Sequence, residues 1–245
     1  MYGVSGQVGI DNRILAALPQ TELSRIKSQL ENVHLEKGRL VYLTGDRIRY
    51  VYFPANGLLS LLSATETGST VEVAMVGNEG IVGLPVILKK GMISYEVTVQ
   101  IPVDAFRIKA EVLQEEFDRG ERLQEHMLSY THVLMAQIAQ LGICNRFHTI
   151  EKALSRWLLL AQDHVKNPNS HSNHLKLTQE NISNALGVPR TAITMAAGNL
   201  QQRGLISYSR GKIEILDRPA LEDNSCECYR IIRDELQQFL GERKS

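Results

Sequence analysis

The sequence predicts an α+β chain with an N-terminal antiparallel β-roll, one long dimerisation helix and a C-terminal winged helix-turn-helix. Three observations support this prediction. Short segments rich in Val, Tyr, Phe and Ile, separated by glycine turns, fill residues 36–108. An apolar heptad repeat follows, and residues 177–216 then have the pattern of helix, tight turn, helix and hairpin. We expect the roll over residues 1–118, the dimerisation helix over 119–144 and the winged domain over 145–245.

Length and composition are those of a chain with two modest domains. It has 245 residues, 43% of them hydrophobic, and its formal net charge is zero. No run approaches the roughly 20 apolar residues of a membrane helix, and the start MYGVSGQVGIDNR lacks the basic and apolar regions of a signal peptide. We expect a cytoplasmic protein without membrane contact.

The N-terminal part begins with helical signals, of which Leu18-Pro19 marks a helix start. From Glu36 the apolar period becomes two, with glycine turns such as Asn56-Gly57. Many short strands joined by such turns are typical of a compact antiparallel barrel or roll.

The long helix carries the predicted dimer interface. Its larger side chains recur at alternating intervals of four and three residues, as in a seam that faces a partner helix. This predicted seam consists of Leu123, Met127, Tyr130, Leu134, Gln137 and Leu141. Its polar member, Gln137, would fix the register of the two helices at some cost in stability. The alternative is that the helix packs on its own roll.

An interruption at residues 142–145 ends this helix, and Asn145 is the expected cap of the next one, which is amphipathic around Trp157. We place the domain boundary there. The polar stretch 164–176 then indicates an exposed loop.

Residues 177–206 predict the helix-turn-helix. Thr178 can cap the first helix, because its hydroxyl accepts a hydrogen bond from an amide of the first turn. Gly187 suits a left-handed residue at the helix end, and Pro189 has the φ angle of a helix start. A second helix over 190–203 would bury Ile193 and present a basic residue, Arg190, at its beginning.

Gly204 ends this second helix, and residues 205–216 alternate around Arg210-Gly211 as a β-hairpin, which is a wing. Residues 178–216 hold four basic and two acidic side chains, so their formal charge of 4 − 2 = +2 does not establish DNA binding alone. The residues expected to contact double-stranded DNA are Thr178, Gln179, Pro189, Arg190, Thr191, Thr194, Met195, Ser209, Arg210 and Lys212. The alternative is a small helical domain whose arginines are merely solvated.

The order of these parts along the chain, a roll, a long helix and a winged domain, resembles that of the CRP/FNR family of bacterial transcription regulators. The resemblance extends over residues 14–216, and its most specific pieces are TQENISNALGVPR, TAITMAAGNLQQRGLI and SRGKIEILD. It implies a homodimer that reads a two-fold site with its second helix in the major groove, with RNA polymerase as a further partner.

Family members that read a TGTGA-like half-site carry Arg-Glu at the start of the recognition helix and an arginine four residues after the glutamate. This chain keeps Arg190 but has Thr191 and Met195 in the other two places, so we expect a different target sequence.

The cyclic-nucleotide cassette of the family is also altered here. It needs a glutamate after Gly83 for the ribose and an arginine before Ser94 for the cyclic phosphate, but Leu84 and Ile93 stand there. Neither side chain can replace those contacts, so we do not expect cAMP to bind in the family manner. A cyclic dinucleotide such as c-di-GMP is one option, and constitutive DNA binding or control by a docked protein are others. The residues considered for an effector are Arg47, Arg49, Gly83, Leu84, Ser94, Arg107 and Tyr130.

No cofactor, metal site or enzymatic activity is predicted. The residue types that suit zinc are His164, His171, His174, Cys226 and Cys228, but their spacing matches no standard motif, so we interpret the histidines as solvated. A cupin-like metalloenzyme needs several histidines in its barrel, and His34 stands alone before residue 117. No Ser-His-Asp set or paired carboxylates stand out either.

Residues 219–240 predict a further helix, because Tyr229, Ile232, Leu236 and Phe239 recur at helical spacing. We expect this tail to pack on the winged domain, with docking of a protein partner as the alternative. The contrasting function for the whole chain is an adaptor that acts through protein partners and binds DNA weakly.

Overall fold

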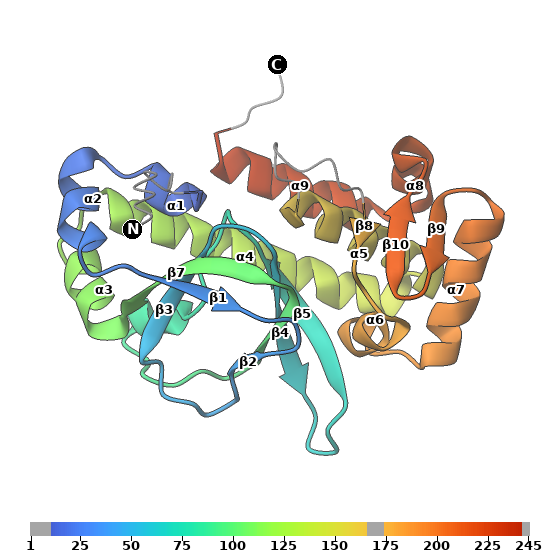
Figure 1. Ribbon diagram of the computed structural model, residues 1–245, viewed down its shortest axis with the longest axis horizontal. Coiled ribbons are helices and arrows are strands. Elements are labelled where there is room, and N and C mark those ends of the chain that lie inside the picture. Colours follow the sequence, from blue (N-terminus) through green and yellow to red (C-terminus); the bar gives the residue numbers. More distant parts are fainter. Residues whose placement is uncertain (1–10, 166–173, 242–245) are drawn as a thin grey trace, which may run out of the picture.

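The fold is of the predicted α+β class and is described by a computed structural model over residues 11–165 and 174–241. The β-roll and the winged helix-turn-helix lie towards opposite ends of the molecule, and one long helix, α4, runs behind both (Figure 1). None of the helices in these two ranges is long and apolar enough to cross a membrane.

Antiparallel sheets form the roll, with the strand orders β1-β7-β3 and β2-β6-β4-β5. The strands are β1 Glu31–Leu35, β2 Leu40–Tyr42, β3 Tyr50–Pro54, β4 Leu58–Ala64, β5 Thr70–Val76, β6 Glu96–Ile101 and β7 Val103–Lys109. Strand β1 begins before residue 36, where we predicted the change to strands. Of its residues only Leu35 is buried, so an apolar alternation is missing and the strand depends on its pairing with β7.

Short helices close the roll: α1 Arg13–Ala16, α2 Gln20–Lys27, the 3-10 helix η1 Leu84–Leu88 and α3 Ala110–Phe117. The side chain of Asn12 fastens α1 to the roll. Its Oδ1 accepts from the Leu15 amide at 3.2 Å, and its Nδ2 donates to the carbonyls of Pro54 and Gly80 at 2.9 Å. Asn12 is fully buried, so these bonds satisfy polar atoms that would otherwise destabilise the fold.

Helix α4 spans Arg122–Phe147 without the predicted interruption at 142–145. Gly142 and Asn145 are helical residues, because one glycine in a helix costs only about 1 kcal/mol relative to alanine and tertiary packing outweighs it. The turn comes after Phe147. The Thr149 hydroxyl, rather than Asn145, accepts a hydrogen bond from a first-turn amide of the following helix at 3.4 Å.

The predicted dimer seam faces the core of the same chain, so this prediction needs correction. Most of its members lie in the hydrophobic cores of the roll and the winged domain: Leu123, Met127, Tyr130, Leu134 and Leu141. Gln137 accepts a hydrogen bond from the Met75 amide of β5 at 3.2 Å instead of meeting a partner helix. A helix on a sheet and a helix in a coiled coil bury nearly the same positions, so the spacing could not separate them.

The winged domain begins with α5, Ile150–Val165. Its further elements are β8 His174–Leu175, α6 Gln179–Leu186, α7 Arg190–Gln202, β9 Ile206–Ser209 and β10 Lys212–Ile215. The strand order is β8-β10-β9, so the end of the stretch that we predicted as an exposed loop is a strand of the wing. Two residues are too few for a periodic signal in the sequence.

Buried polar contacts attach α5 to the roll. The Trp157 indole donates to Glu72 of β5 at 2.9 Å, and Ser60 donates to the same carboxylate. His164 lies 3.1 Å from Glu79 with both side chains buried, although we predicted it to be in an exposed loop. Burial raises the pKa of Glu72 to about 7. Burial alone would lower the pKa of His164, but the facing Glu79 carboxylate outweighs it and raises that pKa.

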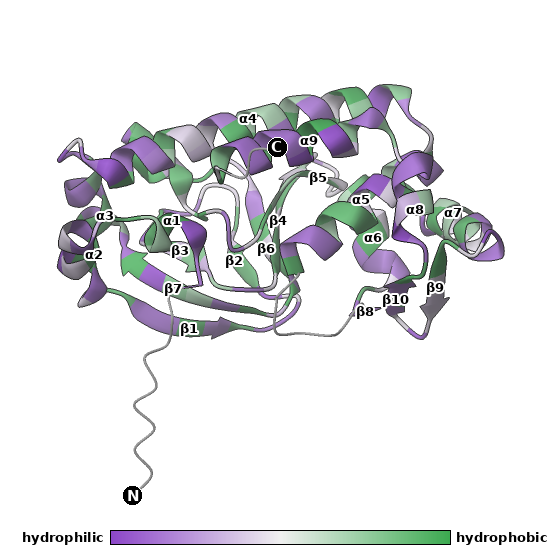
Figure 2. Cartoon of the chain, turned by 90° about the horizontal axis from the view of Figure 1, so that it is seen from above, coloured by the Kyte–Doolittle hydropathy of each residue, from purple (hydrophilic) through white to green (hydrophobic). Residues whose placement is uncertain are grey.

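The C-terminal tail consists of α8, Arg218–Asn224, and α9, Glu227–Phe239. Helix α8 packs on α5 in the predicted way. Helix α9 also lies along α4, as Figures 1 and 2 show from two directions, and its Phe239 ring is 5.8 Å from the ring of Tyr130. The tail therefore contacts both domains and not only the winged one.

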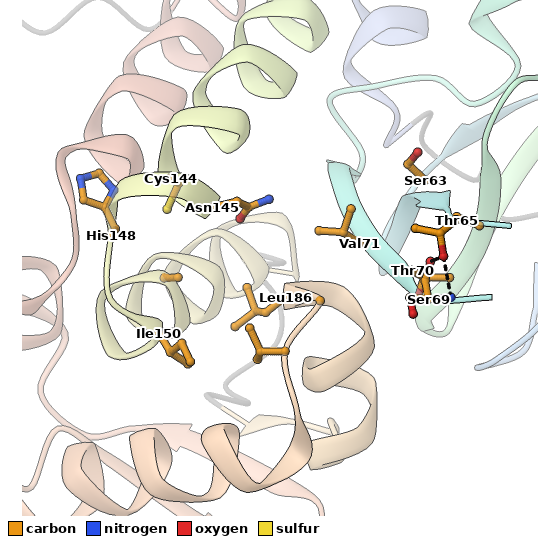
Figure 3. A pocket seen from close by; sticks show the side chains of 14 residues that line it. Ser63, Thr65, Ser69, Thr70, Val71, Cys144, Asn145, His148, Ile150 and Leu186 are labelled. Atoms are coloured by element: carbon orange, nitrogen blue, oxygen red, sulfur yellow. Dashed lines mark hydrogen bonds between the residues drawn. The ribbon is translucent and has the colours of Figure 1, made fainter. Parts of the chain in front are cut away.

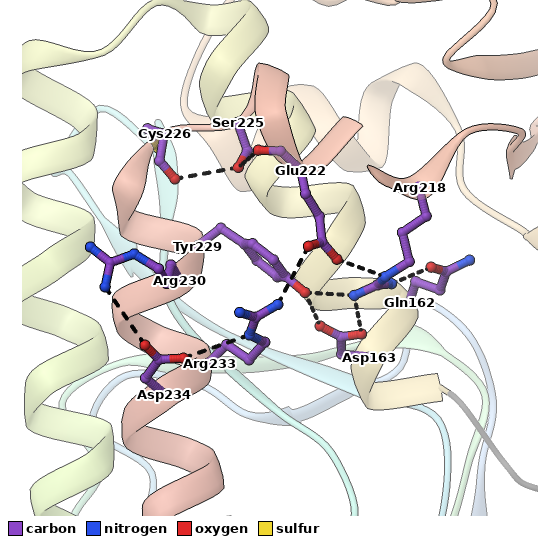
Figure 4. A network of polar contacts seen from close by, with 10 residues as sticks. All are labelled: Gln162, Asp163, Arg218, Glu222, Ser225, Cys226, Tyr229, Arg230, Arg233 and Asp234. Atoms are coloured by element: carbon purple, nitrogen blue, oxygen red, sulfur yellow. Dashed lines mark hydrogen bonds and ion pairs between the residues drawn. The ribbon is translucent and has the colours of Figure 1, made fainter. Parts of the chain in front are cut away.

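Arg218 forms the centre of a polar network that joins α5, α8 and α9 (Figure 4). Its guanidinium donates to Asp163 at 2.7 Å and to Glu222 at 2.9 Å. The Tyr229 hydroxyl donates to the second oxygen of Asp163 at 2.8 Å. The network is partly buried, so it orients α9 relative to the winged domain more firmly than surface ion pairs would.

Candidate nucleic-acid interface

The helix-turn-helix has the predicted ends. Thr178 Oγ1 accepts from the Asn181 amide at 3.1 Å, and the Asn181 side chain accepts from the Thr178 amide, so the two residues form a capping box on α6. Gly187 follows α6 with φ = 65°, the left-handed conformation that favours glycine. Pro189 directly precedes α7.

The outer face of α7 consists of exposed residues, among them the predicted Arg190, Thr191, Thr194 and Met195. The same face continues through Gly198 and Gln202, which are also exposed and follow Thr194 at intervals of four. These two positions were not predicted, although helical spacing from Thr194 leads to them.

Gln179 joins α6 to the start of α7. Its side-chain oxygen accepts from Arg190 Nε at 3.3 Å and lies 3.0 Å from the Thr194 hydroxyl. The arginine at the beginning of α7 is therefore held on the outer side of both helices.

The wing turn is Arg210-Gly211, as predicted. Their φ angles are 49° and 75°, and Ser209 pairs with Lys212 across the turn. Two left-handed residues match the twist of a hairpin with a two-residue turn. Arginine is uncommon in this conformation, because its Cβ makes the left-handed region unfavourable by roughly 1–2 kcal/mol.

The wing tip and the start of α7 border one hollow of about 330 Å³. Its lining residues are Thr178, Gln179, Arg190, Tyr208, Arg210 and Gly211. The structure thus brings the predicted residues of three separate segments together and adds Tyr208, which the sequence did not single out. Arg203, although basic, donates to Glu151 at 2.9 Å and to Asn224 at 2.6 Å, so its side chain is engaged within the chain.

A cleft of about 460 Å³ lies between the β4–β5 hairpin and the winged domain (Figure 3). Val71 of the hairpin and Leu186 of α6 border it, and so do Cys144 of α4 and His148, which directly follows that helix. The Thr70 hydroxyl donates to the Asn184 carbonyl at 3.4 Å, so α6 also contacts the hairpin directly.

The residues considered for an effector do not form one site. Gly83 and Leu84 begin η1, and the side chains of Leu84 and Ile93 are buried in the core of the roll. Tyr130 is buried in that core as well, whereas Ser94 is exposed. Apolar side chains therefore occupy the two positions where the family's cassette has its polar anchors.

Arg107 belongs to a different part of the surface. Its guanidinium is 2.7 Å from Glu31 and lies over the Tyr50 ring, 4.3 Å from the ring centroid. It is therefore already paired and stacked within the chain.

Arg47 and Arg49 line a basic hollow of about 810 Å³ beside η1 and α3. Its other cationic lining residues are Lys89, Lys90 and Lys109. Within residues 11–165 and 174–241, neither arginine has an ion-pair partner, and Lys89 reaches Asp118 only at 4.0 Å. We refer to Arg47, Arg49, Lys89, Lys90 and Lys109 as the basic hollow.

All the cysteines of the chain lie close to His148, which we did not consider as a metal ligand from the sequence. Cys144 of α4 and His148, which directly follows α4, lie beside Cys226 and Cys228 at the start of α9. The four potential ligand atoms lie within 4.8 Å of one another. Cys144 and Cys226 are 82 residues apart in the sequence, so no local motif indicates that these residues form a group. Among the histidines considered for a metal, His164 pairs with Glu79, His174 is an exposed residue of β8, and His171 lies outside the described residues.

This fold and interface define a class: a winged helix-turn-helix DNA-binding protein with a cyclic-nucleotide-binding type of roll. Residues 32–119 match the family described as "Cyclic nucleotide-binding domain", and residues 152–223 match the "Crp-like helix-turn-helix domain". These two matches, which together cover most of the chain, show that it belongs to the CRP/FNR family of transcription regulators.

Curated relatives include two global nitrogen regulators. The protein from Synechococcus elongatus is 23% identical over 221 residues, which are 86% of this chain and 96% of the relative. The protein from Nostoc sp. is 23% identical over 190 residues, which are 74% of this chain and 82% of the relative.

Solved structures share the fold at lower identity. FixK2 from Bradyrhizobium japonicum has a TM-score of 0.66 and 14% identity, with 80% of this chain and 98% of that chain covered. The c-di-GMP responsive global regulator CLP from Xanthomonas campestris has a TM-score of 0.64 and 14% identity, with 81% and 100% covered.

Proposed function

We propose that the chain acts as a homodimer that binds a two-fold DNA site sequence-specifically, with α7 in the major groove. The observation that carries this proposal is the exposed outer face of α7, where Gln179 holds Arg190 beside the wing tip. Side chains of α7 would meet base edges there, while Arg210 and Lys212 would meet phosphates. Met195 offers an apolar contact for a thymine methyl group.

An exposed stripe of α4 supports the dimer in place of the predicted seam. Its exposed members are Leu128, Met135, Ile138 and Gly142, and the half-buried Thr131 completes their intervals of three and four. The exposed fractions of Leu128, Met135 and Ile138 are 49%, 65% and 42%, which is high for such large apolar residues. Pairing two copies along this stripe would bury these side chains and relate the two α7 helices by a two-fold axis.

The basic hollow supports an anionic effector such as a cyclic dinucleotide. Arg47 and Arg49, which have no ion-pair partner among the described residues, match the phosphates of such a ligand, and the structurally similar regulator CLP is c-di-GMP responsive. The buried Leu84 and Ile93 favour a ligand other than cAMP in the usual pocket. The family also implies RNA polymerase as a partner and the cytoplasm as the location.

Gel retardation with a promoter fragment selected from a random pool tests DNA binding. We expect tight binding to the selected fragment that weakens steeply as salt rises. Arg190→Ala should weaken specific binding roughly 5- to 150-fold, the equivalent of about 1–3 kcal/mol for a base contact. Arg230→Ala, which removes an exposed arginine of α9, serves as the matched control. Weak binding that any DNA displaces would favour the adaptor alternative, and an unchanged affinity of Arg190→Ala would remove the role of this residue.

A thermal-shift screen with cAMP, cGMP, cyclic dinucleotides and 2-oxoglutarate tests the effector. A ligand at about 100 times its Kd should add about 2.7 kcal/mol of stability. We expect a cyclic dinucleotide to give a shift that Arg47→Glu abolishes, with the exposed Arg39→Glu as control. A shift with cAMP that survives Arg47→Glu would contradict the assignment to the basic hollow.

A further inference from the structure

We propose that Cys144, His148, Cys226 and Cys228 form a structural zinc site that fastens the tail helix α9 to the end of α4. Thiolate and imidazole are the ligands that tetrahedral zinc prefers in proteins, and a set of four protein ligands is typical of structural rather than catalytic sites. The elements that carry these residues are already fixed against each other by the packing of α9 on α4 and α5.

The distances between the ligand atoms suit a single ion. With zinc bonds of about 2.3 Å to sulfur and 2.0–2.1 Å to nitrogen, neighbouring ligands of a tetrahedral site lie about 3.4–3.8 Å apart. The Sγ atoms of Cys144 and Cys226 are 3.5 Å apart, and Cys228 Sγ is 3.4 Å from His148 Nδ1. No pair of the four atoms exceeds 4.8 Å. An iron–sulfur cluster would hold its ligands farther apart, since several metal atoms lie between them.

Neighbouring side chains orient the ligands as in known metal sites. His148 turns Nδ1 towards Cys228, while its Nε2 lies 3.3 Å from the Glu227 carboxylate. A carboxylate behind the imidazole fixes the ring and leaves the opposite nitrogen free for a metal. Gln140 Nε2 donates to Cys228 Sγ at 3.1 Å, which stabilises a thiolate there.

The charges around the site are compatible with three thiolates. Zinc with three thiolates and a neutral imidazole has a net charge of 2 − 3 = −1, which is unfavourable in a buried place unless it is balanced. Arg156 is only 2% exposed and interacts electrostatically with Cys144 and Cys226. Cys226 and Cys228 also stand at the N-terminus of α9, where the helix dipole favours negative charge.

This site gives the tail a role that its sequence did not reveal. The α4–α5 turn connects the roll and its long helix to the winged domain, and His148 stands in that turn. A zinc ion there would fix the end of α4 and the start of α9 as one unit. Removal of the ion should therefore loosen α9 first.

Metal analysis of the full-length protein tests the proposal directly. The chain is produced without a polyhistidine tag in zinc-supplemented medium and purified without chelator. We expect about one zinc ion per chain. Replacement of zinc by cobalt should produce the strong sulfur-to-cobalt absorption of a thiolate site, which surface histidines cannot produce. This measurement on the unaltered protein does not depend on the folding of any variant.

Variants assign the ligands. Cys228→Ser and His148→Gln should lower the zinc content at least roughly 10-fold, whereas His148→Cys should retain it because four thiolates also bind zinc. His34→Gln, at an exposed histidine of β1, should not change the zinc content. A wild-type protein with less than about a tenth of an equivalent of zinc overturns the proposal. So does an iron–sulfur chromophore, or a Cys144–Cys226 disulfide in the freshly purified protein.

Discussion

Arg210 combines an unfavourable backbone conformation with an exposed charge at the wing tip. Its φ of 49° lies in the region that asparagine and glycine occupy more easily in such turns. Arg210→Asn should therefore leave the free energy of unfolding unchanged or raise it by up to about 1 kcal/mol. The same change should weaken binding to all DNA sequences and reduce the salt slope by about one, because a phosphate contact is lost.

Urea unfolding and salt-dependent retardation measure the two effects of Arg210→Asn separately. Lys212→Asn is the comparison, since Lys212 is exposed and stands just outside the turn, in β10. It should weaken DNA binding without the gain in stability. A clear loss of stability in Arg210→Asn would show that the arginine makes a stabilising contact within the chain.

Glu72 is a buried carboxyl group whose ionisation should make folding pH-dependent. Burial raises its pKa to about 7, against the hydrogen bonds from Ser60 and Trp157 and the charge of Arg156, which lower it. A raised pKa in the folded state means that the stabilising effect of protonation is complete below about pH 4.5 and is lost as the pH rises through about 7. The wild-type protein should lose up to about 3 kcal/mol over this range from Glu72.

Glu72→Gln keeps the shape and removes the charge, so its stability should fall less between pH 5 and 8, and at pH 8 it should equal or exceed the wild type. The His164–Glu79 pair is present in both proteins, but His164 also interacts electrostatically with Glu72, so the comparison includes the smaller change in the pKa of His164. Urea midpoints at several pH values measure the effect, with the exposed Glu66→Gln as control. Equal pH profiles for wild type and Glu72→Gln would mean that Glu72 is charged throughout.

At the level of elements, the different sides of helix α4 contact different parts of the molecule. One face fills the cores of the roll and the winged domain, α9 covers another, and the stripe from Leu128 to Gly142 remains exposed. A helix that carries apolar residues on most of its circumference is expected to be covered on most sides. This distribution explains why the heptad pattern in α4 led us to predict a dimer seam from residues that are buried within the same chain.

Met135→Glu should dissociate the proposed dimer, because two like charges would face each other near the dyad. Met92→Glu is a closely matched control, since Met92 is 62% exposed on the roll and Met135 is 65% exposed on the stripe. Sedimentation at low micromolar concentration should give a monomer for the first variant and a dimer for the second. Leu134→Glu should instead destabilise the folded chain itself, because Leu134 is buried in it. A dimeric, folded Met135→Glu would refute the stripe.

For the molecule as a whole, the tail helix α9 contacts both domains and connects them. Tyr229 and Ile232 of α9 are buried against the winged domain, and Phe239 packs against the roll. A chain that ends at Asn224 should lose roughly 3–6 kcal/mol of stability from the two buried side chains alone, a large part of the 5–15 kcal/mol that is usual for a domain.

Urea unfolding of the truncated chain measures this loss. Arg230→Ala in the intact chain removes an exposed side chain of the same helix and should change stability by less than about 0.5 kcal/mol. An unchanged midpoint after truncation would mean that α9 contributes little to the folded state.

Local patterns in the sequence were sufficient for the helix-turn-helix and the wing. The cap at Thr178, the left-handed Gly187 and the turn at Arg210-Gly211 depend on interactions within a few residues, so their residue types predict their conformations. The glycine-punctuated strands of the roll were predictable for the same reason. The altered positions Leu84 and Ile93 could also be identified along the chain, because the cassette is one continuous segment.

Only the tertiary structure decided which face of α4 is buried and what the cysteines are next to. A heptad repeat indicates which residues are buried, but it does not indicate which surface covers them. In this chain the roll and the winged domain cover them. Cys144 and His148 join Cys226 and Cys228 only because α9 folds back along α4. Contacts across some 80 residues depend on the packing of whole elements, and no spacing in the linear sequence records them.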